Sequence, residues 1–234
     1  MDLAQAILVA LEKAVPPGKS AWSVEPVPIT ECAPEAKTCE HAWLSKFYGG
    51  WVRLESKEHA RSRYTKAAKR IALLVRDMPD PAYAAGKIVG IGVNESGFRE
   101  DVQMGRVSSK EETKLGLRGA GRGPSGEVCF MQILPSMAKK YGPLESFLGE
   151  SDEALDRCFR AAFDQLEDSR KRCSPSKRKI PGAPAGYAPV TELYAMVSRY
   201  GNGSSCTSSN AGKTEARVQT ITWVTVVIRQ SLRS

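Results

Sequence analysis

The chain has few of the residues from which proteins build metal sites. Its 234 residues include two histidines, His41 and His59, and none of its six cysteines belongs to a C-x-x-C pair. Zinc sites take their ligands from closely spaced cysteines and histidines. We therefore expect neither a metal nor another cofactor.

Long apolar runs are lacking as well. No stretch approaches the roughly 18 consecutive apolar residues of a membrane-spanning helix, so we expect no transmembrane segment. The apolar N-terminus carries Asp2 where a secretion signal has lysine or arginine. Because Leu3, Ile7 and Leu11 recur at helical spacing, we interpret residues 2–14 as an amphipathic helix.

The charge balance favours an anionic partner. The net charge is +8, in a chain whose 41% hydrophobic and 26% charged residues are typical of a soluble globular protein. Nucleic acid, an anionic membrane and the bacterial cell wall all fit a basic protein. No helix-turn-helix, zinc-finger or RNP motif accompanies the lysine and arginine runs, so a nucleic-acid-binding module ranks last.

The cysteine count permits up to three disulfides in an oxidising compartment. The pairings that we expect are Cys32 with Cys39, which would close a small loop, and Cys173 with Cys206, which both lie in predicted loops. For Cys129 and Cys158, a disulfide and buried free thiols are equally open.

One apolar stretch, residues 88–98, carries a carboxylate to its end. In a helix, Ile88, Ile91 and Glu95 would share one face, and Ser96 and Gly97 would turn the chain. A carboxyl group at the end of a buried helix is desolvated, which raises its pKa toward the range of a general acid. The alternative is a solvated glutamate at a helix C-terminus.

Two later segments accompany this Glu-Ser element. Residues 126–138 contain a Met-Gln-Ile-x-Pro element, and residues 198–203 contain a Tyr/Asn/Gly element. Three such elements in this order resemble the lytic transglycosylase family, the group of soluble lytic transglycosylases and goose-type lysozymes. The resemblance covers roughly residues 80 to 232.

The resemblance implies a mainly α fold. We expect a lysozyme-like catalytic domain at residues 79–234 and an N-terminal helical region at residues 1–78. It also implies a monomer that acts on peptidoglycan glycan strands, with no nucleic acid as partner. The location would be extracytoplasmic at the cell wall, in the periplasm, exported or delivered by a phage.

The implied reaction needs one carboxylate. Glycosidases generally use two carboxylates, whereas lytic transglycosylases use a single glutamate, which Glu95 matches. The N-acetyl group of the muramic sugar assists, and the glutamate then acts as a base on the C6 hydroxyl. The product is a 1,6-anhydro sugar.

The other matched positions are expected to bind substrate. They are Ser96, which would help to orient the site, Phe130, Met131, Gln132, Tyr200 and Asn202. Tyr200 matches a tyrosine whose hydroxyl lies near the catalytic glutamate in the family. For Met131 and Tyr200, core packing is the alternative interpretation.

The sequence departs from the family pattern at two places. Cys129 stands where the family has glycine, and a side chain there would narrow the space between backbone and sugar. Gly201 separates Tyr200 from Asn202, which shifts the asparagine by one position. These departures leave a non-catalytic wall-binding protein as an alternative. Glu127 is a possible second acid, which would make the protein a goose-type-like lysozyme.

Helical spacing predicts further helices at residues 52–77 and 152–168, and in the segment of Leu193 to Tyr200. A short helix should begin at Pro135. Residues 218–232 are rich in β-branched residues, which favour a strand, but their apolar residues recur at helical spacing and predict a helix. An aromatic cluster from Trp43 to Trp51 is either a sugar-stacking platform or part of a core.

Overall fold

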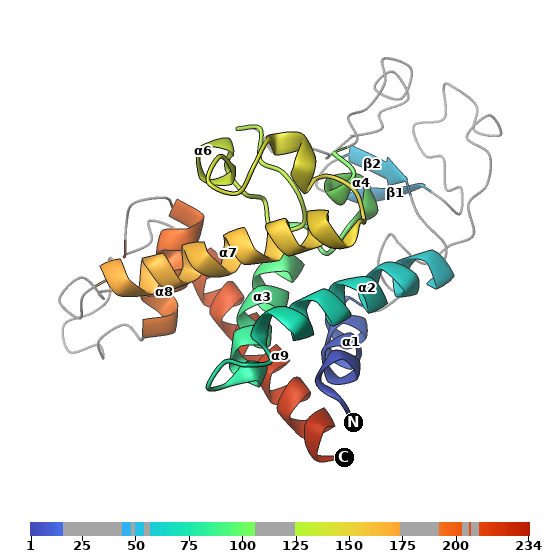
Figure 1. Cartoon of the computed structure of the whole chain (residues 1–234), viewed down its shortest axis with the longest axis vertical. Helices are drawn as coiled ribbons and strands as arrows, with labels where there is room; N and C mark the ends of the chain where they lie inside the picture. The colour runs from blue at the N-terminus through green and yellow to red at the C-terminus, as the bar shows by residue number, and fades with distance from the viewer. Residues whose placement is uncertain are drawn as a thin grey trace.

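The protein is mainly helical, as expected from the sequence, and the structure is a computed structural model (Figure 1). It describes residues 1–15, 44–47, 50–53, 57–105, 125–173, 192–202, 206 and 211–234. In chain order the elements are α1 (Leu3–Ala14), β1 (Leu44–Phe47), β2 (Gly50–Arg53), α2 (Lys57–Val75), α3 (Pro81–Glu95), α4 (Glu100–Gln103), α6 (Pro135–Ala138), η2 (Leu144–Phe147), α7 (Asp152–Arg172), α8 (Glu192–Asn202) and α9 (Ala211–Arg233).

Helix α3 lies in the middle of the molecule, packed against α1, α2, α7 and α9 (Figure 1). It begins where the sequence predicts, because the Asp80 carboxylate accepts a hydrogen bond from the Tyr83 N–H and Pro81 occupies the first turn. Its residues from Ala84 to Gly92 are all buried. An apolar helix of this kind is stable only when other elements cover it on every side.

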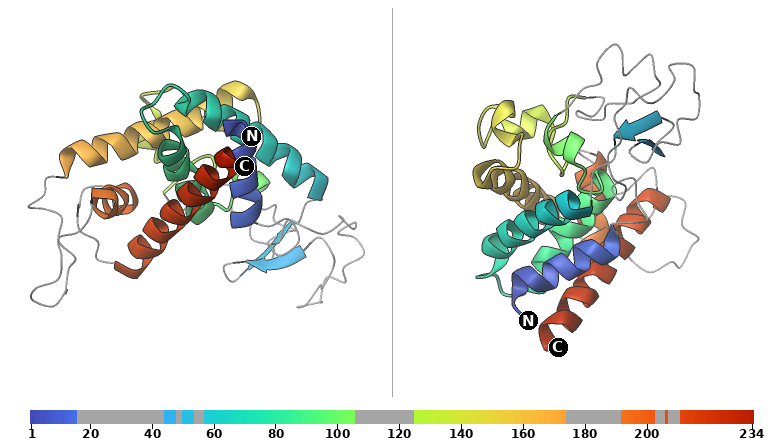
Figure 2. Two further views of the ribbon diagram at one scale, coloured as in Figure 1. Left: turned by 90° about the horizontal axis from the view of Figure 1, so that it is seen from below. Right: turned by 90° about the vertical axis from the view of Figure 1, so that its right-hand side faces the viewer.

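The N-terminal helices belong to the same core. Helix α1 packs on both α2 and α9, and buried residues of α1, α2, α3, α7 and α9 form one continuous hydrophobic cluster. All three views show the chain termini side by side (Figures 1 and 2). The boundary between an N-terminal region at residues 1–78 and a catalytic domain at residues 79–234 stays a prediction. The helices on both sides of this boundary contribute to one hydrophobic core.

One predicted boundary is wrong. The helix expected at residues 52–77 begins at Lys57, and residues 50–53 are the strand β2, paired antiparallel with β1. The segment contains Trp51 and Val52, which favour extended backbone. By contrast, the helix expected at residues 218–232 is confirmed, and α9 starts earlier, at Ala211.

Several predictions fall on residues outside the described ranges. These are the Cys32–Cys39 pairing and the roles of Trp43 and Tyr48 in the aromatic cluster. Within the described residues, none of the helices is long and apolar enough to span a bilayer.

Candidate functional site

Glu95 is the last residue of α3, and 16% of its side chain is exposed. It therefore ends the buried helix with its carboxylate partly accessible to solvent. Its Oε1 accepts a hydrogen bond from Nη2 of Arg217 on α9. The carboxylate is thus held by a cation, in addition to being partly desolvated.

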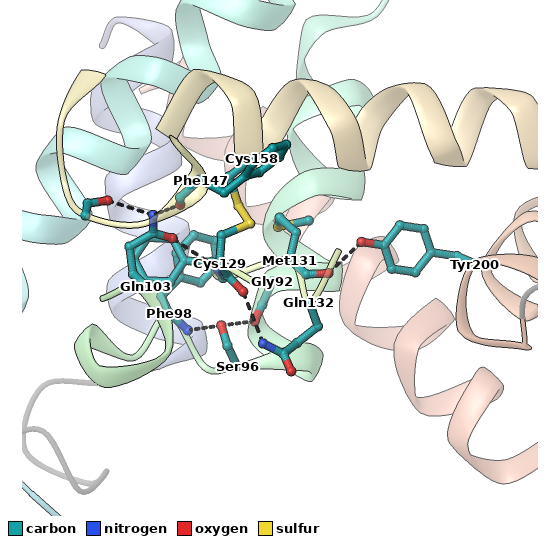
Figure 3. Close-up of a disulfide and its surroundings, with 12 residues drawn as sticks. Gly92, Ser96, Phe98, Gln103, Cys129, Met131, Gln132, Phe147, Cys158 and Tyr200 are labelled. Carbon is teal, nitrogen blue, oxygen red and sulfur yellow. Dashed lines mark hydrogen bonds between the residues drawn. A yellow bond between two sulfur atoms is a disulfide. The ribbon is translucent and has the colours of Figure 1, made fainter. Parts of the chain in front are cut away.

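Ser96 holds the turn that follows Glu95. Its hydroxyl donates to the carbonyl of Gly92 at 3.2 Å and accepts from the N–H of Phe98 at 3.0 Å (Figure 3). The turn needs this support because Phe98 has a positive φ of 55°, which side chains disfavour, whereas the φ of 61° at Gly97 carries no penalty for glycine. The buried hydroxyl is therefore occupied by backbone hydrogen bonds, which fix the orientation of Ser96 immediately after Glu95.

The Met-Gln element forms a tight turn at residues 128–133, named here the site turn. Val128 and Ile133 exchange both of their backbone hydrogen bonds at 3.0 Å, and the N–H of Gln132 donates to the carbonyl of Cys129. Cys129 and Gln132 have φ values of 60° and 50°, a left-handed conformation that side chains other than glycine rarely adopt. Such a turn persists only when its surroundings hold it.

A disulfide and a buried glutamine anchor the site turn. Cys129 is bonded to Cys158 of α7 (Figure 3). The side chain of Gln103 accepts from the N–H of Phe130 at 3.0 Å and donates to the carbonyls of Phe147 and Gly149. Gln103 is fully buried, so all three bonds form away from water and fix the turn to its neighbours.

The disulfides settle two of the predictions on cysteine. Cys173 is bonded to Cys206, as expected. For Cys129 and Cys158, of the two possibilities left open by the sequence, the structure has the disulfide, because they are bonded to each other. Cys129 is fully buried and turned toward α7, so its side chain fills the core rather than a space at the surface of the turn.

Tyr200 of α8 joins the third element to the second. Its hydroxyl donates to the carbonyl of Met131 at 2.7 Å (Figure 3). Burial raises the pKa of Tyr200 well above its usual value, and the negative charge of Glu95 raises it further. The hydroxyl therefore stays protonated, and it lies within electrostatic range of Glu95 while it holds the site turn.

Two expected substrate contacts are core residues in this structure. Phe130 is fully buried, with its ring 5.1 Å from that of Phe98 and 6.4 Å from that of Phe159. Met131 is also fully buried, and its sulfur lies beside Gly92 of α3. The alternative of core packing therefore holds for the Met131 side chain, and the expectation of a substrate contact is corrected for both residues.

Gln132 is the residue of the site turn whose polar side chain reaches the surface. It is partly exposed, and its Nε2 donates to the carbonyl of Cys129 at 3.2 Å. Glu127 is also partly exposed, but its carboxylate accepts from the N–H of Ser125 in its own loop, at 2.9 Å. Asn202 is the last residue of α8, and its side chain lies outside what the structure describes.

Arg217 is the site residue that the motifs do not indicate. The sequence contains one signal for it, because Arg217 stands four residues before Ile221 and seven before Val224, on the apolar face of α9. A charged residue on the buried face of a helix requires a partner. The partner, Glu95, is 122 residues away in the sequence, so only the packing of α3 on α9 identifies it.

Among the described residues, no group of three histidine, cysteine, aspartate or glutamate side chains could hold a metal ion. The polar groups described at the site are the carboxylate of Glu95, the guanidinium of Arg217, the hydroxyl of Tyr200 and the amide of Gln132. Comparisons of the chain with protein-family models, with curated proteins and with solved structures find no match.

Proposed function

We propose that the protein is a peptidoglycan lytic transglycosylase, which breaks the β-1,4 bond between N-acetylmuramic acid and N-acetylglucosamine with Glu95 as its one catalytic carboxylate. The observation that carries the proposal is the meeting of the three sequence elements at one place. The hydroxyl of Tyr200 binds the carbonyl of Met131, and Tyr200 is under the electrostatic influence of Glu95. The Met131 sulfur lies beside Gly92 of α3, one helical turn before Glu95, which supports the association of the three segments.

The first step is acid catalysis. Glu95 in its protonated form donates its proton to the glycosidic oxygen, and the bond from that oxygen to the anomeric carbon breaks. The N-acetyl group of the muramic sugar supports the positive charge at the anomeric carbon, which removes the need for a second protein carboxylate. The partly exposed amide of Gln132 is available to hold an N-acetyl or hydroxyl group of the glycan.

The second step uses the same residue as a base. The Glu95 carboxylate takes the proton of the C6 hydroxyl, whose oxygen attacks the anomeric carbon and closes the 1,6-anhydro ring. The proton given in the first step is recovered, so the enzyme returns to its starting state. The net charge of +8 favours the approach to an anionic wall polymer.

Muropeptide analysis tests the proposal. Purified peptidoglycan is digested with the wild type, with Glu95→Gln and with the control Glu145→Gln, and the products are separated and weighed. Glu145 is an exposed carboxylate on η2 and has no role in the mechanism. We expect anhydro-muramyl products from the wild type and the control, and a loss of at least about a hundredfold in Glu95→Gln.

Two other results would replace the proposal. Products heavier by one water, with reducing muramic ends that depend on Glu95, would indicate a goose-type-like lysozyme and a role for Glu127. Intact binding to the wall with no products from any of the three proteins would indicate a non-catalytic wall-binding protein.

A further inference from the structure

Arg217 is a buried cation that the proposed reaction does not use. The residue is 5% exposed, and its Nη2 donates to Oε1 of Glu95. Among the described residues, its Nε finds no hydrogen-bond partner. A buried guanidinium is stabilised only through its partners, so in the described structure the placement of Arg217 depends on Glu95.

The packing of α3 against α9 brings this pair together. Gly86 and Gly90 face α9, and a Cβ atom on Gly90 would lie 2.8 Å from the Cα of Ile221. Because the two glycines are one helical turn apart, α3 and α9 stay close along this length. Arg217 lies one turn beyond Ile221 on α9, which is where α3 ends in Glu95.

Gly201 of α8 packs directly against the guanidinium of Arg217. A Cβ atom at this position of α8 would lie 2.3 Å from Nη1 of Arg217 and 3.2 Å from its Cζ. The glycine that separates Tyr200 from Asn202 therefore has a physical role, because it leaves room for the cation next to Glu95.

We infer that Arg217 is a positioning residue for Glu95, which holds the carboxylate at the end of α3 in its charged form and confines acid catalysis by Glu95 to acidic pH. The inference rests on the proposed function. In the described part of the chain, Arg217 of α9 forms an ion pair with Glu95, and Tyr200 of α8 lies within electrostatic range of it. Tyr200 stays neutral because burial raises its pKa, so Arg217 supplies the charge that favours the ionised carboxylate.

The first measurement does not depend on activity. Unfolding by urea is compared for the wild type, Glu95→Gln, Arg217→Met and the double variant at neutral pH. We expect a coupling of roughly tenfold in the unfolding equilibrium constant, because each single substitution removes the same ion pair. Additive effects of the two substitutions would overturn the inference.

The second measurement is the pH profile of muropeptide release. Without the cation, the protonated form of Glu95 persists to higher pH. In Arg217→Met, the pH at which muropeptide release falls off on the alkaline side (the high-pH limb) should therefore rise by about one pH unit or more. Arg217→Lys keeps the charge and should keep the limb near that of the wild type. If the high-pH limb of Arg217→Met matched that of the wild type, the proposal that Arg217 controls acid catalysis would be wrong.

Gly201→Ala provides an independent variant, in case Arg217→Met does not fold. The added methyl group displaces the guanidinium, so we expect the same upward movement of the limb while the charge of the protein is kept. A wild type that releases no muropeptides, but whose variants show the coupling in urea unfolding, would overturn the proposed function and the control of acid catalysis by pH. It would still support the ion pair by which Arg217 holds Glu95.

Discussion

At the residue scale, the left-handed conformation of Cys129 gives the first prediction. With Cys158→Ala as a common background, Cys129→Gly should be more stable than Cys129→Ala by about 1 kcal/mol, because glycine adopts a positive φ without the steric penalty of a Cβ atom. Both double variants should be less stable than the wild type by about 2–4 kcal/mol, through loss of the disulfide. Urea unfolding measures all three.

Equal stability of the two double variants would mean that the site turn relaxes once the disulfide is gone. The single variant Cys158→Ala is the matched control, since it loses this disulfide, keeps Cys129 and leaves the Cys173–Cys206 bond in place. Its stability should lie near that of the alanine variant, because a free Cys129 carries the same penalty at positive φ.

What the sequence predicts at this scale depends on the range of the contact. The sequence predicts correctly that Glu95 ends the buried helix, because Asp80 and Pro81 mark its start and Ser96 and Gly97 turn the chain at its end. The family resemblance assigns Phe130 and Met131 to the substrate, although side chains that flank a tight turn can point to either side of it. Local pattern indicates that Arg217 needs a partner but does not identify Glu95 as that partner, because the packing of α3 on α9 brings the two together.

At the element scale, α9 shows that the spacing of apolar residues can outweigh intrinsic propensity. Its segment around Trp223 is β-branched, yet Ile221, Thr225 and Ile228 are buried on one face, and the segment is a helix. The energy gained by burying this face against α3 and α1 exceeds the few tenths of a kcal/mol by which such residues disfavour a helix. Periodicity was therefore the correct guide.

The close approach of α3 and α9 gives a second prediction, for Gly90→Ala. Alanine in place of glycine favours a helix by about 1 kcal/mol. Here its Cβ would lie 2.8 Å from the backbone Cα of Ile221, which cannot rotate away, so the two helices must separate. We expect a net destabilisation of about 1–3 kcal/mol in urea unfolding.

Gly86→Ala provides the contrast. Its nearest neighbour is Oγ1 of Thr225, at 2.0 Å from the added Cβ, and the backbone Cα of Thr225 is farther away, at 3.2 Å. Thr225→Ala should therefore be less destabilising in the Gly86→Ala background than in the wild type. Ile221→Ala removes the Cγ1 contact of 2.5 Å but leaves the backbone Cα and N at 2.8 Å and 3.0 Å, so it should relieve Gly90→Ala less than Thr225→Ala relieves Gly86→Ala. Equal relief in the two cases would contradict the distinction between side-chain and backbone contacts.

At the scale of the whole molecule, one ion pair connects α3 to α7. Lys87 is nearly buried, and its Nζ donates to Oε1 of Glu167 at 2.5 Å. The same Nζ lies 5.0 Å from the ring centre of Tyr83 and 4.9 Å from that of Phe163. Burial raises the pKa of Glu167, but hydrogen bonds from Lys87 and Arg170 outweigh it, so the net pKa lies below the usual value. The carboxylate form is therefore the one that the fold binds.

This lowered pKa sets the sign of a pH dependence. A carboxyl group whose pKa is lower in the folded state stabilises the fold above its unfolded pKa, and the stabilisation disappears as the pH falls through its folded pKa. In Glu167→Gln the buried Lys87 loses its charged partner at every pH, so at neutral pH we expect a destabilisation of about 1–3 kcal/mol. Thermal unfolding of both proteins from neutral to strongly acidic pH should show the two melting temperatures converging as Glu167 of the wild type becomes protonated. A constant difference between them down to the most acidic pH would contradict the assignment of the stabilisation to the charged pair, and would point to the packing of the side chain instead.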